Sequence, residues 1–330
     1  MDSSSDGEGE SGPDLVRAKE QYGLYCALCH GAEGQGYAAD GANALNHPKF
    51  LATASDDLIR RAIVRGRTGT PMSAWSAAWG GPLDEAGIAG LTGLIRSWES
   101  EAPIEVDPAA VDGSAGIGQA VYAVHCEGCH GPAGAGALYM SLADPGFLAD
   151  ATDGYLKYAI EGGRTGTPMQ AYASSLTVQQ IADVVALIRS WARPIDDTAP
   201  ELPSKDISDA LLNPGGPEPA FADSERFISV EQLKLAMDTE ASFVIVDARA
   251  PSDYVTGHIT GSVSVPFYDV AAYLDQLPTE QWIVTYCGCP HAASEAAADA
   301  LLGAGHTKVR VLYEGLDLWV DQGYPTETGP

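Results

Sequence analysis

The sequence predicts three folded domains in 330 residues: two all-α domains followed by an α/β domain with a central parallel sheet. Three observations lead to this prediction. The first 200 residues contain an internal repeat, each copy has helical periodicity, and the rest of the chain contains apolar, β-branched runs. The expected parts are a disordered tether at 1–13, helical domains at 14–104 and 105–197, a linker or extended strap at 198–222, and the α/β domain at 223–330.

The composition indicates a globular protein with a strongly acidic surface. Hydrophobic residues make up 45% of the chain, charged residues make up 19%, and the formal net charge is −27. Such a charge repels nucleic acid and anionic lipid, so we exclude both as partners. No apolar run reaches the roughly 18 residues that a membrane helix needs. The opening MDSSSDGEGESGPD lacks the basic start and apolar stretch of a signal peptide, and we expect it to be disordered.

The repeat consists of three pairs of matching segments. YCALCHG at 25–31 matches HCEGCHG at 125–131, PKFLATASDDLIRRAIVRGRTGTPMSAW at 48–75 matches PGFLADATDGYLKYAIEGGRTGTPMQAY at 145–172, and LIRSWE at 94–99 matches LIRSWA at 187–192. Each copy predicts a helix before the cysteines, a second helix at 56–64 or 152–160, and a last amphipathic helix at 83–98 or 176–191. About 90 residues with so few helices make a thin core, so something besides side chains is expected to fill the centre.

The motif Cys-x-x-Cys-His occurs once in each copy. Its residues are Cys26, Cys29 and His30 in the first copy and Cys126, Cys129 and His130 in the second. This spacing is that of covalent haem c attachment. Helical residues i and i+3 share a face, so both sulfurs can reach the vinyl groups of one porphyrin, and the histidine can ligate the iron. We therefore predict two covalently attached haem c groups; a zinc ion shared by the two cysteine pairs is the alternative.

A second axial ligand is expected from the repeated segment GRTGTPM, which supplies Met72 in the first copy and Met169 in the second. In both copies the thioether follows proline in a Gly-rich loop that can approach a flat ring closely. Met140 and His47 are alternative ligands. Ligation by histidine and methionine leaves no open position at the iron, which favours electron transfer over oxygen or substrate activation.

With these motifs, both repeats resemble the class I cytochrome c family from about residue 14 to residue 193. The resemblance implies that Tyr22 and Tyr122 pack the N-terminal helix, and that Trp98 and Trp191 close the C-terminal helix that crosses it. It also implies redox partner proteins and a periplasmic or outward-facing, membrane-associated location in a bacterium, because haem is attached outside the cytoplasm. An unprocessed form with a lipid anchor is compatible with the acidic tether.

The C-terminal third changes from helical periodicity to apolar runs. FVIVDAR at 243–249, WIVTYC at 282–287 and VRVLYEG at 309–315 predict buried parallel strands, and helical stretches are expected at 230–237, 267–276 and 292–305. Cys287 ends the second run, shortly before a predicted helix. Loops at the carboxyl ends of parallel strands often hold functional sites, and a helix N-terminus there lowers the pKa of a thiol. Cys287 is therefore the predicted nucleophile.

The segments VDAR, YVTGHITGSVSVPF, VTYC and EGLDLWVDQGYP, in this order, resemble a rhodanese domain over residues 223 to about 326. The resemblance implies that Cys287 takes a sulfane sulfur and holds it as a persulfide. It also implies that Asp247, Arg249 and His258 belong to the scaffold.

Two further residues of the loop after Cys287 complete the predicted catalytic set. Cys289 is expected to resolve the persulfide, to form a Cys-x-Cys disulfide, or to have no role. His291 is the one cationic side chain that the loop offers. In a chain this acidic, so weakly charged a loop favours a persulfide or other sulfane-sulfur donor over the thiosulfate dianion.

The combined prediction is a periplasmic dihaem cytochrome c whose electron transfer is coupled to sulfur handling at Cys287, with rhodanese-type sulfurtransferase activity. Oxidising a thiol and a sulfide to a persulfide releases two electrons, and two haems accept one each. Two alternatives stay open: a pure electron carrier with a silent rhodanese-like docking domain, or the electron-accepting subunit of a larger oxidoreductase.

Overall fold

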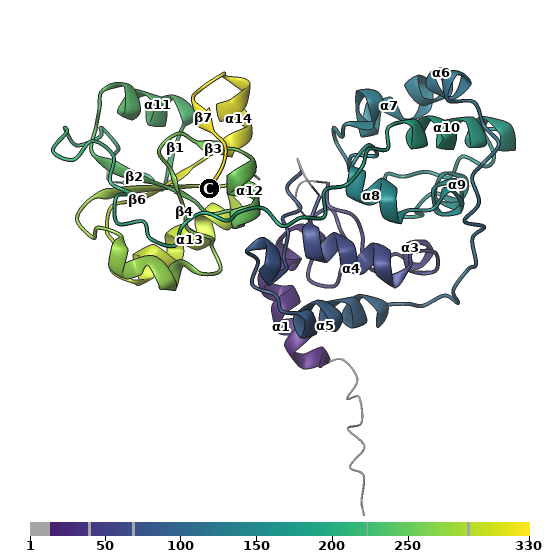
Figure 1. The fold of residues 1–330 in the computed structure, drawn as a ribbon, viewed down its shortest axis with the longest axis horizontal. Coiled ribbons are helices and arrows are strands. Elements are labelled where there is room, and N and C mark those ends of the chain that lie inside the picture. The colour runs from purple at the N-terminus through teal and green to yellow at the C-terminus, as the bar shows by residue number, and fades with distance from the viewer. Residues whose placement is uncertain (1–13, 39–40, 68–69, 223, 289–290) are drawn as a thin grey trace, which may run out of the picture.

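The computed structural model describes residues 14–38, 41–67, 70–222, 224–288 and 291–330. The helical part of the chain lies on one side of the molecule and the α/β domain on the other (Figure 1). The predicted tether at 1–13 lies outside the described residues, as does Cys289. Among the described helices, none is both long and apolar enough to cross a membrane.

The first helical unit, residues 14–104, is built around two crossing helices. Its helices are α1 (Leu15–Tyr25), α2 (Ala27–His30), α3 (Pro48–Leu51), α4 (Asp56–Arg65), the 3-10 turn η1 (Ala77–Trp79) and α5 (Glu85–Arg96). Asp14 caps helix α1, and its carboxylate accepts hydrogen bonds from two amides of the first turn. The helices predicted at 56–64 and 83–98 are confirmed as α4 and α5.

The second helical unit, residues 105–197, repeats this plan. Its helices are α6 (Ala115–His125), α7 (Glu127–His130), the 3-10 turn η2 (Pro132–Gly134), α8 (Pro145–Asp150), α9 (Asp153–Gly162) and α10 (Val178–Ser190). Ser55 caps α4 and Thr152 caps α9, each through a side-chain oxygen that accepts a hydrogen bond from the backbone three residues on. The two units therefore share the order of their α-helices and the capping of α4 and α9.

An edge-to-face aromatic pair closes the helix crossing in each unit, as the resemblance implied. The rings of Tyr22 and Trp98 are 5.1 Å apart between centroids, and those of Tyr122 and Trp191 are also 5.1 Å apart. Each tyrosine hydroxyl donates a hydrogen bond to the glycine carbonyl that follows the motif histidine, at 2.9 Å in the first unit and 2.8 Å in the second. These bonds hold the cysteine–histidine segments against the helix crossing.

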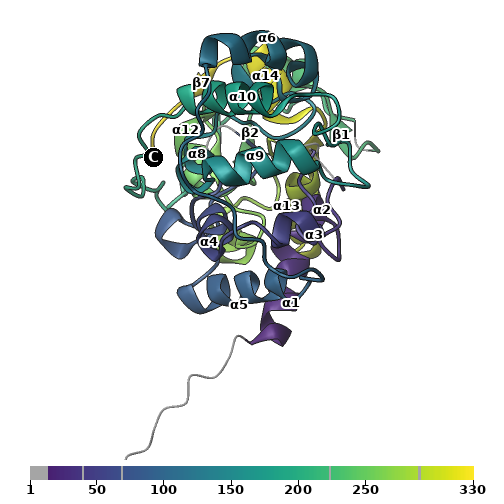
Figure 2. The ribbon, with the colours of Figure 1, turned by 90° about the vertical axis from the view of Figure 1, so that its right-hand side faces the viewer.

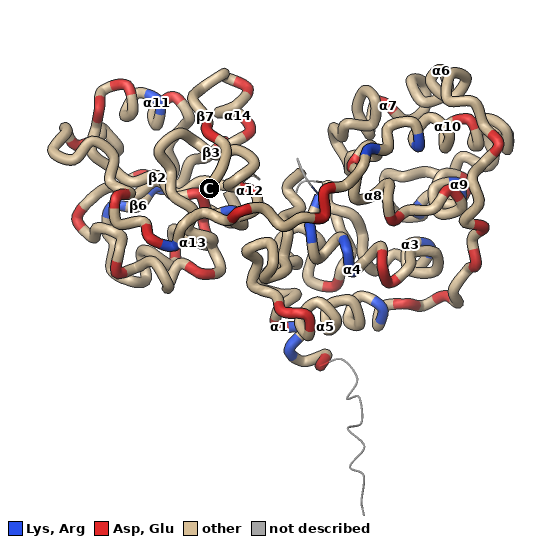
Figure 3. Tube along the Cα trace, viewed as in Figure 1, with Lys and Arg blue, Asp and Glu red and all other residues tan. Residues whose placement is uncertain are grey.

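The two helical units stack on each other, with α8 and α9 of the second facing α3 and α4 of the first (Figure 2). Basic residues gather around α4 (Figure 3). Arg61 and Arg65 both bind the buried carboxylate of Asp150, at 2.7 and 2.6 Å, and Arg67 binds Asp144 at 3.0 Å. Buried carboxylates with arginine partners thus join the two units.

The α/β domain contains the predicted central parallel sheet. Its strand order is β1 (Phe227–Ile228), β6 (Val309–Leu312), β5 (Trp282–Tyr286), β2 (Phe243–Asp247) and β4 (Val263–Ser264), all parallel. Strands β3 (His258–Ile259) and β7 (Thr326–Glu327) form a small antiparallel pair. The helices are α11 (Val230–Asp238), α12 (Pro251–Thr256), α13 (Ala292–Gly303) and α14 (Gly315–Asp321).

The helical stretch predicted at 267–276 begins three residues later than expected. Residues Val270–Gln276 form a 3-10 helix, η3. The backbone N–H of Phe267 instead donates to the carbonyl of Ala248, 3.0 Å away. That bond continues the sheet pairing past β4, so the helix can begin only after it.

The segment 198–222 packs against the α/β domain over part of its length. Ile207 and Ala210 are buried in the apolar cluster that contains Val244 and Val246 of β2, and Phe221 is buried in the second cluster of this domain. The N–H of Leu212 donates to the carbonyl of Phe243 at 2.9 Å. This part of the chain is therefore an extended strap.

Candidate functional site

A short helix presents the cysteines and histidine of each helical unit. In the first unit, Cys29 and His30 both donate backbone hydrogen bonds to the carbonyl of Cys26, at 3.2 and 2.9 Å. The second unit has the same two bonds to Cys126, at 3.1 and 2.9 Å. The four cysteines are half-buried and none is in a disulfide. Both thiols of a pair therefore lie on one turn, as attachment to a single porphyrin requires.

The two motif histidines are oriented by backbone carbonyls. His30 donates from Nδ1 to the carbonyl of Asn43 at 2.8 Å, and His130 donates from Nδ1 to the carbonyl of Met140 at 3.0 Å. Burial lowers the pKa of both imidazoles, although the carbonyls act in the opposite direction. Both histidines are thereby kept neutral, with Nε2 available as an iron ligand.

The first cysteine of each motif lies in surroundings that disfavour its thiolate form. Burial, followed by the charge of the paired cysteine, raises the pKa of Cys26 to about 12 and that of Cys126 to about 11. Within the described ranges, no three His, Cys, Asp or Glu side chains gather to hold a metal ion. The donor set of two thiols and one neutral imidazole fits haem c, which would supply a one-electron redox centre when bound.

The predicted methionine ligands lie in loops with equivalent hydrogen bonds. The carbonyl of Met72 accepts from Arg67 N at 2.8 Å, and the carbonyl of Met169 accepts from Arg164 N at 2.7 Å. The N–H of each methionine donates to a threonine hydroxyl two residues earlier, at 3.2 Å. Both side chains are half-buried against the helical core. This equivalence favours the same role for both methionines.

The alternative ligands have other partners. His47 accepts a hydrogen bond from Lys49 N at Nδ1 and donates from Nε2 to the carbonyl of Thr165, at 3.2 and 3.0 Å, so both ring nitrogens are engaged. The Met140 carbonyl accepts the Nδ1–H of His130, and the Met140 sulfur accepts a hydrogen bond from Asn43 Nδ2 at 3.2 Å. Both residues are therefore already engaged in contacts other than iron ligation.

The predicted nucleophile follows β5 directly. Cys287 is fully buried, and its sulfur lies 3.4 Å from the hydroxyl oxygen of Ser294 on the first turn of α13. Its carbonyl accepts a hydrogen bond from Leu316 N at 2.9 Å. Sequence analysis missed Ser294; the available signal was a hydroxyl seven residues after the cysteine, where the predicted helix begins.

His291 borders the loop and is bound to an acidic side chain. Its Nδ1 lies 2.6 Å from Glu295 Oε1, and its ring stacks on Tyr313 with centroids 5.2 Å apart. The backbone of His291 is left-handed, with φ of 47°, at the position that caps α13. Glu295 therefore offsets the positive charge that His291 could bring to the loop.

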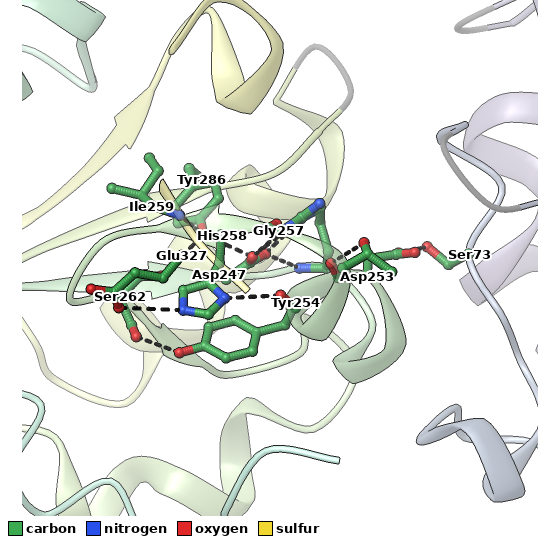
Figure 4. Close-up of polar contacts among 12 residues, drawn as sticks. Ser73, Asp247, Asp253, Tyr254, Gly257, His258, Ile259, Ser262, Tyr286 and Glu327 are labelled. Atoms are coloured by element: carbon green, nitrogen blue, oxygen red, sulfur yellow. Dashed lines mark hydrogen bonds and ion pairs between the residues drawn. The ribbon is translucent and has the colours of Figure 1, made fainter. Parts of the chain in front are cut away.

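A buried polar network supports the strand ends beside the loop (Figure 4). The carboxylate of Asp247 accepts hydrogen bonds from Tyr286 Oη at 2.8 Å and Arg249 Nη2 at 2.6 Å. Arg249 also donates to the carbonyl of Gly257 at 2.6 Å, and Tyr254 stacks on His258 with centroids 3.7 Å apart. These contacts agree with the scaffold roles that the resemblance implied.

The α/β domain contacts the first helical unit beside the predicted ligand Met72. Ser73 donates to Asp253 Oδ2 of α12 at 2.6 Å (Figure 4). Tyr268 donates to the carbonyl of Gly80 at 2.9 Å, and its ring lies 6.2 Å from that of Trp75 and 6.0 Å from that of Tyr25. Sequence analysis missed this contact, because it joins residues about 180 or more positions apart.

The contact is expected to weaken as pH rises from about 4 to about 6. Burial raises the pKa of Asp253 to about 6, while Ser73 and Arg249 act against the shift and Asp247 adds to it. A carboxyl with a raised pKa binds its proton more tightly in the docked state, so docking is strongest below the ordinary pKa and weakens as pH rises through about 6. The radius of gyration from small-angle scattering should increase over this range. If the radius of gyration of Asp253→Asn depended on pH in the same way, the effect could not be assigned to the Asp253 carboxyl.

Comparisons with known proteins match two parts of the chain. Residues 229–322 match the model of the rhodanese-like domain, and residues 113–188 match the model of cytochrome c oxidase, cbb3-type, subunit III. The thiosulfate sulfurtransferase GlpE of Pseudomonas entomophila is 37% identical over 103 residues, covering 31% of this chain and 89% of that protein. GlpE of Pseudomonas putida F1 is 34% identical over 87 residues, covering 26% of this chain and 76% of that protein.

Two solved structures are also similar. The rhodanese-like domain of an Anabaena protein is 32% identical and covers 32% of this chain and 80% of that chain, with a TM-score of 0.30. The reducing HAO-like protein complex of Kuenenia stuttgartiensis is 19% identical and covers 56% of this chain and 99% of that chain, with a TM-score of 0.36.

Proposed function

Because the chain belongs to the rhodanese-like domain family through residues 229–322 and has a cytochrome c-type domain at residues 113–188, we propose that it is a dihaem electron-transfer protein that handles sulfur at Cys287. The proposal of two haems rests on the equivalence of the cysteine, histidine and methionine sites in the two helical units. The first unit has the same backbone bonds at its cysteines, the same carbonyl acceptor on its histidine and the same methionine loop as the second. Both units therefore suit the same cofactor.

The proposed location is the periplasm or another outward-facing compartment of a bacterium. A cytochrome c-type domain supports it, because haem attachment takes place outside the cytoplasm. The proposed partners are redox proteins that accept electrons from the haems and a donor of sulfane sulfur.

Persulfide or polysulfide is the proposed source of sulfur. The relatives named above are thiosulfate sulfurtransferases, so thiosulfate is the natural comparison. A Cβ atom at Gly288 would lie 3.5 Å from Arg249 Cδ, which places an arginine beside the loop. However, Asp247 and Gly257 occupy its guanidinium, and Glu295 binds His291. Because these side chains already have partners, they attract the thiosulfate dianion weakly. This favours sulfur donors of lower charge.

Electrons released at Cys287 are proposed to enter the first helical unit. The Cys287 thiolate and a hydrosulfide ion combine into a persulfide: an S–S bond forms, the hydrosulfide S–H bond breaks, and one proton and two electrons leave. Two haems, when bound, would accept these electrons one at a time. The short contact between Asp253 and Ser73, next to Met72, keeps the two parts of the chain together and supports this route.

Stopped-flow mixing of the oxidised protein with sulfide tests the coupling. The wild-type protein is expected to show haem reduction, and Cys287→Ser is expected to lose this phase because the hydroxyl cannot form a persulfide. Dithionite reduction of the same variant provides the control that its haems remain competent. Haem reduction by sulfide at an unchanged rate in Cys287→Ser would remove the thiol from the electron pathway.

One observation favours a second candidate, in which the rhodanese-like domain serves only for docking. Cys287 is fully buried, whereas Tyr268 and Phe267 of the same domain pack against the core of the helical region. Persulfide labelling separates the two functions. A labelled Cys287 after exposure to polysulfide or thiosulfate supports sulfur handling, and its absence with both donors supports docking alone.

A further inference from the structure

The two helical units meet at the segments that carry the histidine-binding carbonyls. The rings of Tyr37 and Tyr139 pack edge to face, with centroids 6.0 Å apart and planes at 89°. The backbone of Gly41 lies so close to Leu138 that a Cβ atom at position 41 would fall 2.5 Å from the Leu138 carbonyl oxygen. Glycine is required there, because any side chain would force the segments apart.

A direct hydrogen bond joins the units within this contact. The side-chain amide of Asn43 donates from Nδ2 to the thioether sulfur of Met140, 3.2 Å away. The backbone carbonyls of the same two residues accept the Nδ1–H bonds of His30 and His130. Both residues of the bridge are half-buried, so the contact is partly shielded from water.

The two residues of the bridge occupy equivalent positions of the internal repeat. The offset of 97 residues that aligns the proline at 48 with that at 145 also aligns Asn43 with Met140. One copy therefore presents an N–H donor and the other an acceptor at the same position, across an approximately symmetric contact. Two methionines could not make this hydrogen bond.

We propose that Asn43 and Met140 form a bridge for electron exchange between the two haem sites, an inference that rests on the proposed dihaem function. The path from the His30 ring to the His130 ring consists of the covalent bonds of the two bridge residues and three hydrogen bonds, of 2.8, 3.2 and 3.0 Å. With haem bound at both sites, passage of one electron would oxidise the iron held by one histidine from ferrous to ferric and reduce the other from ferric to ferrous. Both Nδ1 protons stay in place.

Another hydrogen bond between the units provides a matched control. Lys49 donates from Nζ to the carbonyl of Gly162 at 2.5 Å, and neither residue contributes a donor or acceptor to a motif histidine. Lys49→Met removes this bond while retaining most of the side-chain length. It reports the effect of weakening the packing between the units without touching the bridge.

The test is nuclear magnetic resonance exchange spectroscopy on the half-reduced, full-length holoprotein. Asn43→Leu removes the donor and Met140→Leu removes the acceptor at nearly constant volume, and both keep the backbone carbonyls. Each single variant is expected to slow electron exchange. The double variant should be no slower than either single variant, because both substitutions remove the same hydrogen bond. Lys49→Met should exchange at the wild-type rate.

Hydrogen exchange of backbone amides provides a readout that does not depend on electron flow. Met140→Leu is expected to accelerate amide exchange at residues 41–46 by about fivefold, the effect of losing one neutral hydrogen bond. Intact mass gives the number of haems. Two haems with electron exchange at the wild-type rate in both variants would overturn the bridge alone, even if amide exchange rises. Fewer than two haems in the wild-type chain would overturn the proposed dihaem function and the bridge with it.

Discussion

Replacing Cys26 and Cys29 together by alanine is expected to leave one covalently bound haem per chain. The two sulfurs lie on one turn, at half-buried positions against the first helical core, and they are the proposed attachment points of that unit. Without them a haem at His30 would be held by axial ligands alone and would be lost on denaturation. Intact mass spectrometry of the denatured protein measures the change directly.

The repeat provides the matched controls for this experiment. The pair Cys126→Ala and Cys129→Ala is expected to remove the other haem, and the fourfold variant should carry none. Cys287→Ala should retain both, because its thiol is buried in the α/β domain at the end of β5. A wild-type chain with a single haem, or no loss in the first variant, would show that the first unit holds its cofactor differently or holds none.

The parts of the fold that were predicted correctly are those whose periodicity extends over several residues. Helices α4, α5, α9 and α10 present apolar faces at helical spacing, and β2 and β5 are runs of five fully buried residues. Edge strands β1 and β4 have two residues each, too few for any pattern to be recognised. The 3-10 helix η3 was mistaken for a longer helix because a sheet bond at its start is invisible in the sequence.

The part of the candidate site that could be predicted consists of residues that lie close together in the sequence. Cys-x-x-Cys-His indicates haem attachment within five residues, so the proposed haem-binding cysteines and histidines follow from spacing alone. The contacts of Asp253 with Ser73 and of Met140 with Asn43 join residues 180 and 97 positions apart. Such contacts form only when folded domains pack against each other, so the hydrophobic periodicity of a single sequence does not predict them.

Asp247→Ala is expected to destabilise the α/β domain by about 3 to 5 kcal/mol, the usual cost of removing one partner from a buried ion pair. The Asp247 side chain is 0% exposed and that of Arg249 is 14% exposed. Burial by itself would lower the pKa of Arg249, but the Asp247 charge raises it overall, so the guanidinium stays charged. The variant leaves this buried charge uncompensated and also removes the acceptor for the Tyr286 hydroxyl.

Hydrogen exchange of the β2 and β5 amides is the appropriate measurement, because a chain of several domains does not unfold in one transition. Asp238→Ala, which removes an exposed ion pair with Lys234 in the same domain, should cost at most about 0.5 kcal/mol. The double variant Asp247→Ala with Arg249→Met should recover part of the loss, because it removes the stranded charge. An unchanged haem spectrum in all three variants would localise the effect to the α/β domain. If the double variant were less stable than Asp247→Ala alone, the loss would come from packing and hydrogen bonding, and the uncompensated charge would not be its main cause.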